Sequence, residues 1–171
     1  MADLTQKDRL QPSLLDRLTD NDPERKQESR DARVLSPSRL RDCVRRDLAW
    51  LMNTTHLKSV MNLDDYPLVA SSVVNFGLPD LAGRTTSTVD EVELEQSIRK
   101  VILDFEPRLV AQTLQVKVFK DEKRMNRNAM FFDIEAELWA QPLPLRLFLR
   151  TTVDLESGSI DIVDKGSQGG N

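Results

Sequence analysis

The residues with the clearest potential for chemistry are an acid and a base on either side of a proline, in the sequence Glu106-Pro107-Arg108. A proline disfavours the helical conformation of the residue before it, so Glu106 is expected to leave a helix in an extended conformation. If Arg108 is extended too, its guanidinium and the Glu106 carboxylate point to the same side, because residues two apart share a face of an extended chain. Such a pair suits either a catalytic site or a charged contact that orients or docks the domain.

A carboxylate pair is the one catalytic arrangement that the chain offers. Glycoside hydrolases use two closely spaced acids, and the candidates are Asp104 with Glu106, or Glu135 with Glu137. A general acid has to hold a proton, whereas an arginine beside Glu106 favours the ionised carboxylate. A lysozyme-like peptidoglycan hydrolase therefore stands as the alternative function, and we assign no catalytic residue.

The sequence lacks the residues that a nucleophilic triad, a common metal site or a phosphate loop would need. The single histidine is His56 and the single cysteine is Cys43, so neither a nucleophilic triad nor a common zinc site is expected. The sequence shows no calcium-loop pattern and no glycine-rich phosphate loop. We therefore predict no metal site and no cofactor.

The composition is typical of one soluble domain with polar extensions. The chain has 171 residues, of which 39% are hydrophobic and 30% charged, enough for one well-packed core and short for two. Its formal net charge of −4 argues against nucleic acid as a partner, because that binding depends on clustered Lys and Arg. No apolar run is long enough for a membrane span, and the N-terminus lacks the pattern of a secretory signal. We therefore expect a cytoplasmic protein that does not insert directly into a membrane.

Residues 1–35 are expected to form a partner-binding segment and a charged linker. Ser13 is a candidate N-cap for a short helix, and residues 19–33 carry charges of both signs, which is typical of a solvated linker. The leucines of the short helix either fold back onto the core or insert into a groove of a partner protein. They recur at helical spacing: Leu10, Leu14, Leu15 and Leu18.

Start and stop signals predict three helices in the folded domain, which is expected to span residues 36–164. Thr88 with Glu91 three residues later forms a capping box, the clearest of these signals. The first and third segments also have apolar side chains at helical spacing, which predicts amphipathic helices. The three run from Ser36-Pro37 to Met52, from Tyr66-Pro67 to Gly77, and from Thr88 to Phe105.

After Arg108 the apolar side chains recur with the period of a strand, which is two. Short loops separate the alternating segments, so an antiparallel meander of three to four strands is expected. The predicted fold class is α+β, with amphipathic helices packed on one face of the sheet. Residues 165–171 are expected to form a disordered tail. The alternating segments run from Leu114 to Phe119, from Phe132 to Leu138, from Leu145 to Leu155, and through Ile160 and Ile162.

The other face of this sheet combines charges of both signs with aromatic rings. Charges alone are typical of a solvated face, and added aromatic rings favour a protein partner. A helix or the N-terminal segment covering the rings is the other interpretation, and the sequence leaves both open. The aromatic residues of this face are Phe119, Phe131, Trp139 and Phe148.

Three segments of the chain form an ordered set: 12–18 (PSLLDRL), 72–81 (SVVNFGLPDL) and 105–109 (FEPRL). Taken in this order, they resemble the baseplate-wedge family of contractile phage tails, historically labelled lysozyme-like. Within that family they are most similar to the TssE baseplate subunits of bacterial type VI secretion systems. Phe105 departs mildly from the pattern, since many phage relatives have tryptophan there.

The resemblance implies a non-enzymatic role in assembly. Such a subunit lies beside TssF and TssG in the baseplate wedge, with TssK as a further candidate partner, and provides a platform on which the TssB/TssC sheath begins to polymerise. Its baseplate is docked at the inner face of the bacterial inner membrane. The strand region resembles the interlocking domain of the sheath, which implies that the sheet adds or accepts strands. Glu106 and Arg108 match the charged motif of the family, which implies contact with the wedge core.

From the leucines, the aromatic rings and the resemblance together, we select candidate residues for partner binding. The set is Glu106, Arg108, Leu14, Leu15, Leu18, Phe119, Trp139 and Phe148.

Overall fold

The structure, a computed structural model, describes residues 13–19, 24, 36–120, 129–139 and 144–164. Most of the predicted linker, Leu10 and the predicted tail lie outside these residues. In chain order the elements are α1 (Leu14–Leu18), α2 (Pro37–Met52), η3 (Leu57–Ser59), α3 (Pro67–Ala70), η4 (Val73–Asn75), α4 (Glu91–Phe105), β1 (Gln115–Lys120), β2 (Ala129–Leu138), β3 (Leu145–Asp154) and β4 (Ile160–Asp164), where η marks a 3-10 turn.

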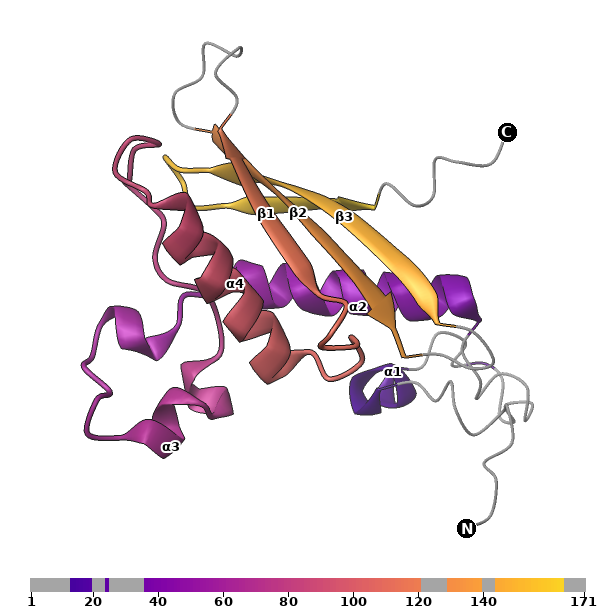
Figure 1. Ribbon diagram of the computed structural model, residues 1–171. Helices are drawn as coiled ribbons and strands as arrows, with labels where there is room; N and C mark the ends of the chain where they lie inside the picture. The colour runs from indigo at the N-terminus through magenta and orange to yellow at the C-terminus, as the bar shows by residue number, and fades with distance from the viewer. Residues whose placement is uncertain (1–12, 20–23, 25–35, 121–128, 140–143, 165–171) are drawn as a thin grey trace.

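The strands form one open antiparallel sheet in the order β1-β2-β3-β4, so every strand pairs with its neighbour in sequence. The two long helices pack against the same face of this sheet (Figure 1). Helix α4 contacts β1, while α2 contacts β3 and β4. The predicted α+β fold, with amphipathic helices on one face of an antiparallel meander, is confirmed.

Helices α2 and α4 match the prediction, with one correction at the start of α4. The first helix spans its predicted residues, and the third ends at Phe105 as expected. Its N-cap is Asp90 and not Thr88, because the Asp90 carboxylate accepts from two backbone N–H groups of the first turn. The Thr88 hydroxyl bonds within the preceding turn instead.

The predicted helix from Tyr66-Pro67 to Gly77 is wrong, because the segment forms only α3 and η4. Ser72, between them, has an extended backbone, and its hydroxyl donates to a carbonyl of α3. The side-chain amide of Asn75 then donates a hydrogen bond to the carbonyl of Ala70, the last residue of α3. Side-chain hydrogen bonds therefore replace the backbone bonds that would have continued the helix.

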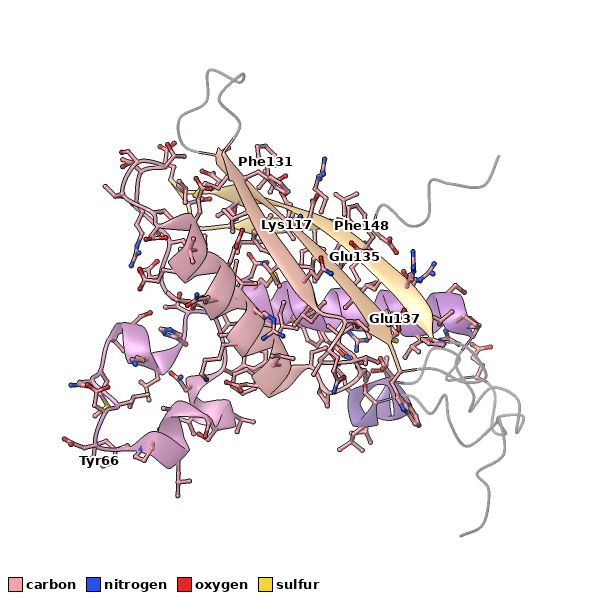
Figure 2. All side chains as sticks on the ribbon, in the orientation of Figure 1. Tyr66, Lys117, Phe131, Glu135, Glu137 and Phe148 are labelled. Carbon is pink, nitrogen blue, oxygen red and sulfur yellow. The ribbon has the colours of Figure 1, made fainter. Side chains whose placement is uncertain are left out.

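The sheet face turned away from α2 and α4 carries the predicted mixture of charges and rings (Figure 2). Lys117 and Glu135 are exposed there, and Phe131 and Phe148 are half-buried. Their positions follow from the strict alternation of the strands, in which every second side chain is buried beneath the sheet.

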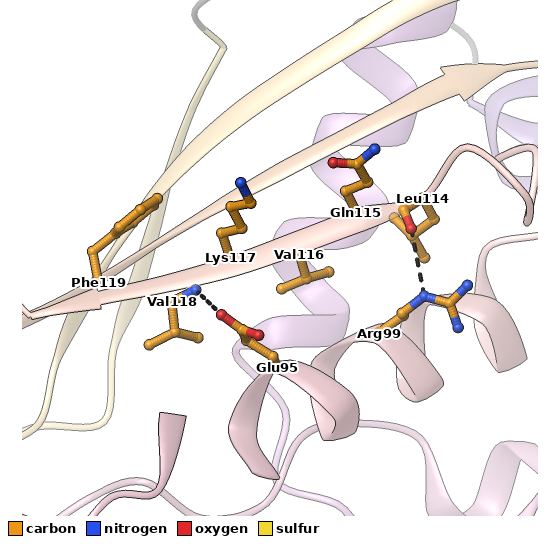
Figure 3. A pocket seen from close by; sticks show the side chains of 8 residues that line it. All are labelled: Glu95, Arg99, Leu114, Gln115, Val116, Lys117, Val118 and Phe119. Carbon is orange, nitrogen blue, oxygen red and sulfur yellow. Dashed lines mark hydrogen bonds between the residues drawn. The ribbon is translucent and has the colours of Figure 1, made fainter. Parts of the chain in front are cut away.

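At one edge of the sheet, side chains of α4 reach the backbone of β1 (Figure 3). Glu95 Oε1 accepts from the Val118 N–H at 2.8 Å. One turn later, Arg99 Nε donates to the Leu114 carbonyl at 3.4 Å. Helix α4 therefore covers the inner face of β1 and also occupies part of its outer edge.

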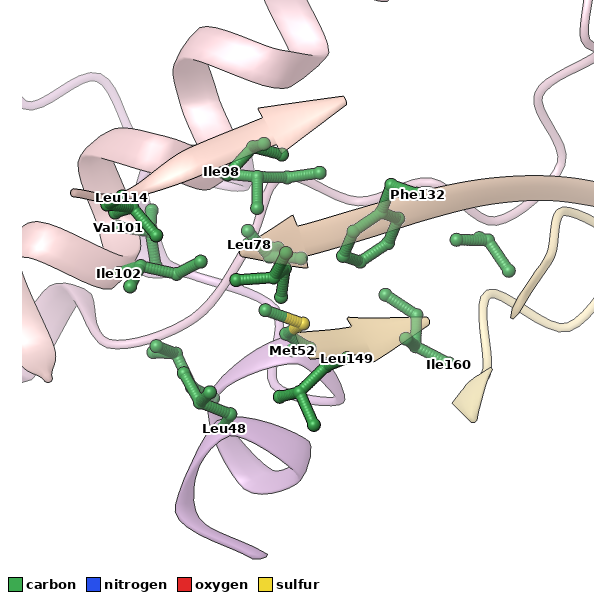
Figure 4. Close-up of a cluster of buried hydrophobic side chains, with 14 of the residues drawn as sticks. Leu48, Met52, Leu78, Ile98, Val101, Ile102, Leu114, Phe132, Leu149 and Ile160 are labelled. Atoms are coloured by element: carbon green, nitrogen blue, oxygen red, sulfur yellow. The ribbon is translucent and has the colours of Figure 1, made fainter. Parts of the chain in front are cut away.

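The core lies between the helices and the sheet, and it is almost entirely aliphatic (Figure 4). Leu48 of α2, Ile98 of α4 and Phe132 of β2 are fully buried within it. Leu78, which follows the segment between α2 and α4, is buried there too and forms a bridge with Thr55. This core fixes the ends of α2 and α4 relative to the sheet, and those ends carry the candidate site.

Candidate partner-binding surfaces

The Glu106-Pro107-Arg108 motif forms an ion pair at the end of α4. Glu106 is the C-cap of α4, with φ −122° and ψ 78°, so the chain leaves the helix before the proline as predicted. Arg108 Nε donates to Glu106 Oε1 at 2.7 Å, and Arg108 Nη2 donates to Oε2 at 2.5 Å. The two side chains do share one side of the chain. Glu106 is only 4% exposed, so this carboxylate lies inside the protein.

Asp47 of α2 extends the pair into a longer set of contacts. Arg108 Nη2 donates to Asp47 Oδ2 at 2.6 Å, and the other Asp47 oxygen accepts from Arg46. Arg46 Nη1 in turn donates to Asp16 Oδ1 of α1 at 2.6 Å. We call these residues the charge network, which runs from α4 through α2 to α1: Glu106, Arg108, Asp47, Arg46 and Asp16.

Ion pairing keeps Arg108 and Asp16 of the charge network ionised, although burial opposes their charged forms. Burial disfavours the charged form of Arg108, but the adjacent carboxylates, Glu106 first, outweigh this effect and raise the pKa of Arg108 above its ordinary value. Burial also opposes the ionised form of Asp16, yet its hydrogen-bond donors, Arg46 first, lower the pKa of Asp16 from 3.8 to about 2. Both residues are therefore charged at neutral pH.

Helix α1 lies on α2 with its acid inward and its leucines outward. The Asp16 side chain is only 10% exposed where it meets Arg46. Folding of the leucine cluster onto the core, one of the two sequence-based alternatives, does not occur for the described leucines, and Leu10 lies outside the described residues. The exposed fractions are 70%, 44% and 73% for Leu14, Leu15 and Leu18.

Trp50 is a further exposed apolar side chain, and it lies beside Arg46. The guanidinium carbon of Arg46 is 5.0 Å from the ring centroid of Trp50, a cation–π distance. Trp50 is half-exposed and lies one turn further along α2. Sequence reasoning did not select Asp16, Arg46, Asp47 or Trp50 as site residues. For Arg46 and Asp47, their polar side chains away from the apolar stripe of α2 were the available signal.

The predicted aromatic residues fall into two groups. Trp139 lies beside the Glu106 motif, because its backbone N–H donates to the Arg108 carbonyl at 2.8 Å. Phe119 is opposite Phe131 near the other end of β1, and Phe148 is opposite Glu135 in the middle of the open face. Only Trp139 is therefore brought next to Arg108.

The segment between α2 and Gly77 forms a projection that exposes several apolar side chains, which we call the apolar lobe. Buried Asn75 holds it together, since its Oδ1 accepts from the Lys58 N–H while its amide bonds to α3. Sequence reasoning assigned the apolar side chains from Tyr66 onward to a helix, although two adjacent serines, Ser71 and Ser72, argued against one. The exposed residues of the lobe are Val60, Met61, Tyr66, Leu68, Val73 and Val74.

In the first carboxylate pair of the hydrolase alternative, Asp104 with Glu106, each acid is paired with a cation of the chain. Both oxygens of Glu106 accept from Arg108, and Asp104 pairs with Lys100. Glu135 and Glu137 lie two residues apart on the open sheet face. Among the described residues, no three His, Cys, Asp or Glu side chains are grouped to hold a metal ion. Within the same residues, no helix has the length and apolar character needed to cross a membrane.

Comparison with known protein families identifies the family of the chain. The family model described as baseplate wedge protein gp25 matches residues 38–143, which include α2, α4, the Glu106 motif and the first two strands. No match is found among curated proteins or among solved structures. Because the matched range covers more than half of the chain, the chain belongs to the family of baseplate wedge protein gp25, which includes TssE.

Proposed function

We propose that the chain is a TssE-type subunit of a type VI secretion baseplate, joining the wedge to the contractile sheath and supporting the start of sheath assembly. The structural baseplate role follows from the family. The proposed wedge partners are TssF and TssG, with TssK as a further partner, and the proposed sheath partners are TssB and TssC. The subunit acts in the cytoplasm, in a baseplate docked at the inner membrane, without enzymatic activity or a cofactor.

The outward leucines of α1 are the observation that carries this proposal. A leucine left exposed forgoes about 1.5–3 kcal/mol relative to burial, and α1 exposes three of them: Leu14, Leu15 and Leu18. A five-residue helix is unstable alone, so α1 depends on contacts with α2, among them the ion pair of Asp16 with Arg46. A preformed helical turn reduces the ordering cost of binding, which suits a docking element for a groove in the wedge.

Glu106 and Arg108 have different parts in this surface. Because Glu106 is buried, it acts on a partner through Arg108, which it fixes by two hydrogen bonds. The Arg108 side chain remains 25% exposed. Trp139, half-exposed and bonded to the Arg108 carbonyl, extends the wedge-facing surface. We assign Phe119 and Phe148, on the open sheet face, to contacts with the sheath.

Co-expression with TssF and TssG tests this proposal. The double variant Leu14→Ser and Leu18→Ser should lose co-purification with the wedge proteins, while its circular dichroism spectrum stays that of the wild type, since neither leucine is in the core. Val92→Ser is the matched control, because Val92 is 60% exposed on α4.

Normal complex yield from the double leucine variant would remove α1 from the interface. Equal losses from Val92→Ser would show that any lost apolar surface weakens the complex, which the proposal does not predict. If the wild-type chain brings down neither wedge protein, the TssE assignment itself fails.

A further inference from the structure

The charges of the open sheet face, which is turned away from α2 and α4, are sorted by strand (Figure 2). On β3 they are Arg146 and Arg150, with one acid, Asp154, at the last position of the strand. β2 and β3 are the two central strands of the sheet, so the middle of the face has a basic half and an acidic half. On β2 the charged residues of this face are all acidic: Asp133, Glu135 and Glu137.

Most of these charges are not paired within the part of the chain that the structure describes. Arg150 with Asp133 is the one ion pair of this face among those residues. Glu137 lies directly opposite Arg146 in the register, yet no ion pair joins them. Glu135 and Arg146 are exposed, and Glu137 is half-buried. Three charged side chains in the middle of the sheet are therefore available to a partner.

A second copy of the chain has the complementary pattern. A two-fold symmetric dimer uses the same surface of both copies, so each of its contacts occurs twice. If the axis runs along the strands, between β2 and β3, then β2 of one copy lies over β3 of the other and acids meet bases. An axis across the strands would set β2 against β2, and acids would meet acids. The charges therefore select the axis along the strands.

With this axis, each residue of β2 lies over the residue of the second copy that its own chain places opposite it in the register. Glu137 is opposite Arg146, and Glu135 is opposite Phe148. Glu137 of one copy therefore meets Arg146 of the other, and the reverse contact forms as well. Glu135 meets the ring of Phe148, between the guanidinium groups of Arg146 and Arg150 on the same strand.

The outer strands fit the same arrangement. Because β1 of one copy then lies over β4 of the other, Lys117 meets Val163, which is 55% exposed, and Phe119 meets Asp161. The acid at the end of β3, Asp154, is opposite the uncharged Ala129. None of these contacts brings like charges together.

The size of the face suits a weak dimer. The strands have 6, 10, 10 and 5 residues, and at about 4.8 Å between strands and about 3.4 Å per residue they form a face of about 500 Å². Two copies would bury about 1,000 Å² in total, which is the lower limit for a specific interface. The dimer should therefore form only at micromolar or higher concentration.

We propose that the free chain forms a two-fold symmetric dimer through the open sheet face, with β2 of each copy over β3 of the other and Glu137 paired with Arg146 of the second copy. The sheath contacts proposed for Phe119 and Phe148 use the same face, so the dimer is a state of the free subunit. It goes beyond the proposed function, and its tests need no baseplate or sheath protein, so either can fail without the other.

Sedimentation velocity of the full chain from about 1 to about 100 µM measures this association. The mass of the wild type should rise from 19.5 kDa toward twice that value. Arg146→Glu and Glu137→Arg each put like charges into both symmetric contacts, so each should weaken the dimer at least about tenfold. Arg39→Glu is the matched control, because Arg39 is exposed on α2, and it should dimerise like the wild type.

A mixture of the two interface variants tests the geometry directly. At this contact Arg146→Glu has acids on both strands and Glu137→Arg has bases on both, so one copy of each restores both charge pairs. The mixture should therefore form a mixed dimer as tightly as the wild type, although neither variant dimerises alone. The double variant Glu137→Arg and Arg146→Glu exchanges the two charges and should dimerise too. Circular dichroism should show all of these variants folded.

A wild type that stays at 19.5 kDa at the highest concentration would overturn the proposal. A mixture that stays monomeric would do the same, because restored charge pairs would then have no effect. Equal weakening by Arg39→Glu and Arg146→Glu would indicate a general effect of charge and also contradict it. Loss of the dimer in the double variant Leu14→Ser and Leu18→Ser would assign the interface to α1 instead of the sheet.

Discussion

At the scale of single residues, the central feature is the buried carboxylate of Glu106, which accepts hydrogen bonds from the guanidinium of Arg108. Glu106 lies inside the protein, and Arg108 joins it to Asp47 of α2. A buried ion pair contributes little net stability, yet removing one partner leaves an unpaired buried charge. Arg108 therefore links the end of α4 to α2, and in the proposed function its exposed part contacts a partner.

Removing Arg108 alone from its ion pair with Glu106 should lower the free energy of unfolding. We expect Arg108→Met to lower the free energy of unfolding by about 3 kcal/mol, the lower end for a buried pair, because Arg108 is partly exposed. The double variant Glu106→Gln and Arg108→Met should recover at least half of the loss, since the unpaired charge is gone. Urea denaturation measures both.

Arg150→Met is the control, because Arg150 makes a similar two-bond pair with Asp133 on the open sheet face and is 42% exposed. Its cost should stay below about 1 kcal/mol. Equal costs for Arg108 and Arg150 would mean that Glu106 is not buried in solution.

The docking of α1 should depend on pH through Asp16. Its pKa is lowered from 3.8 to about 2 in the folded protein, so its contribution is fully present above pH 4 and is lost as the pH falls from about 4 to about 2. We expect about 1 kcal/mol after solvent screening. Amide chemical shifts of Leu14–Leu18, followed by NMR from pH 5 to pH 2, should report the release of α1.

Asp16→Asn removes the titrating group and should give shifts that no longer change over this range. A transition of unchanged midpoint in Asp16→Asn would assign the pH dependence to another group.

At the scale of elements, the sequence predicted the helices and strands whose apolar residues recur periodically. It missed the features that depend on a hydrogen bond of a single side chain. The alternation after Leu114 and the spacing in α2 predicted the sheet and its helices, since burial of one face imposes those periods. The helix expected from Tyr66 failed because Ser72 and Asn75 bond to the backbone of α3. The position of α1 on Arg46 was also beyond prediction, since it depends on a contact between residues thirty apart in sequence.

Gly77 is the residue that allows the apolar lobe to rejoin the core. Its φ is 124°, and a Cβ atom there would lie 2.2 Å from the Thr54 carbonyl oxygen. Gly77→Ala should therefore cost more than about 3 kcal/mol of unfolding free energy, because it adds a backbone clash to the strain of a positive φ. Thermal and urea denaturation are the measurements.

Gly83→Ala is the matched control, with φ 73° and no atom within 4 Å of the added Cβ. It should cost only about 1 kcal/mol, the strain alone. Similar losses at both glycines would contradict the close approach of Gly77 to Thr54.

At the scale of the whole molecule, one face of the sheet is used for folding and the remaining surfaces are available for assembly. The helices bury the inner face, while the leucines of α1 are exposed and the side chains of the open sheet face are exposed or half-buried. The sequence indicated both as candidate partner surfaces, because aromatic or apolar side chains are gathered there, and it left open whether the chain itself covers them. It did not predict that the side chains of Asn53, Glu95 and Arg99 bond to the backbone at the sheet edges, because these contacts join residues that are distant in sequence.

The most direct test of a structural role in the baseplate is sheath assembly in cells that lack this chain. With a fluorescent TssB subunit, we predict that cells without the chain form no extended sheaths. The wild-type chain should restore them, and the double variant Leu14→Ser and Leu18→Ser should not, although it folds normally. Sheaths that form at normal frequency without the chain would contradict the account.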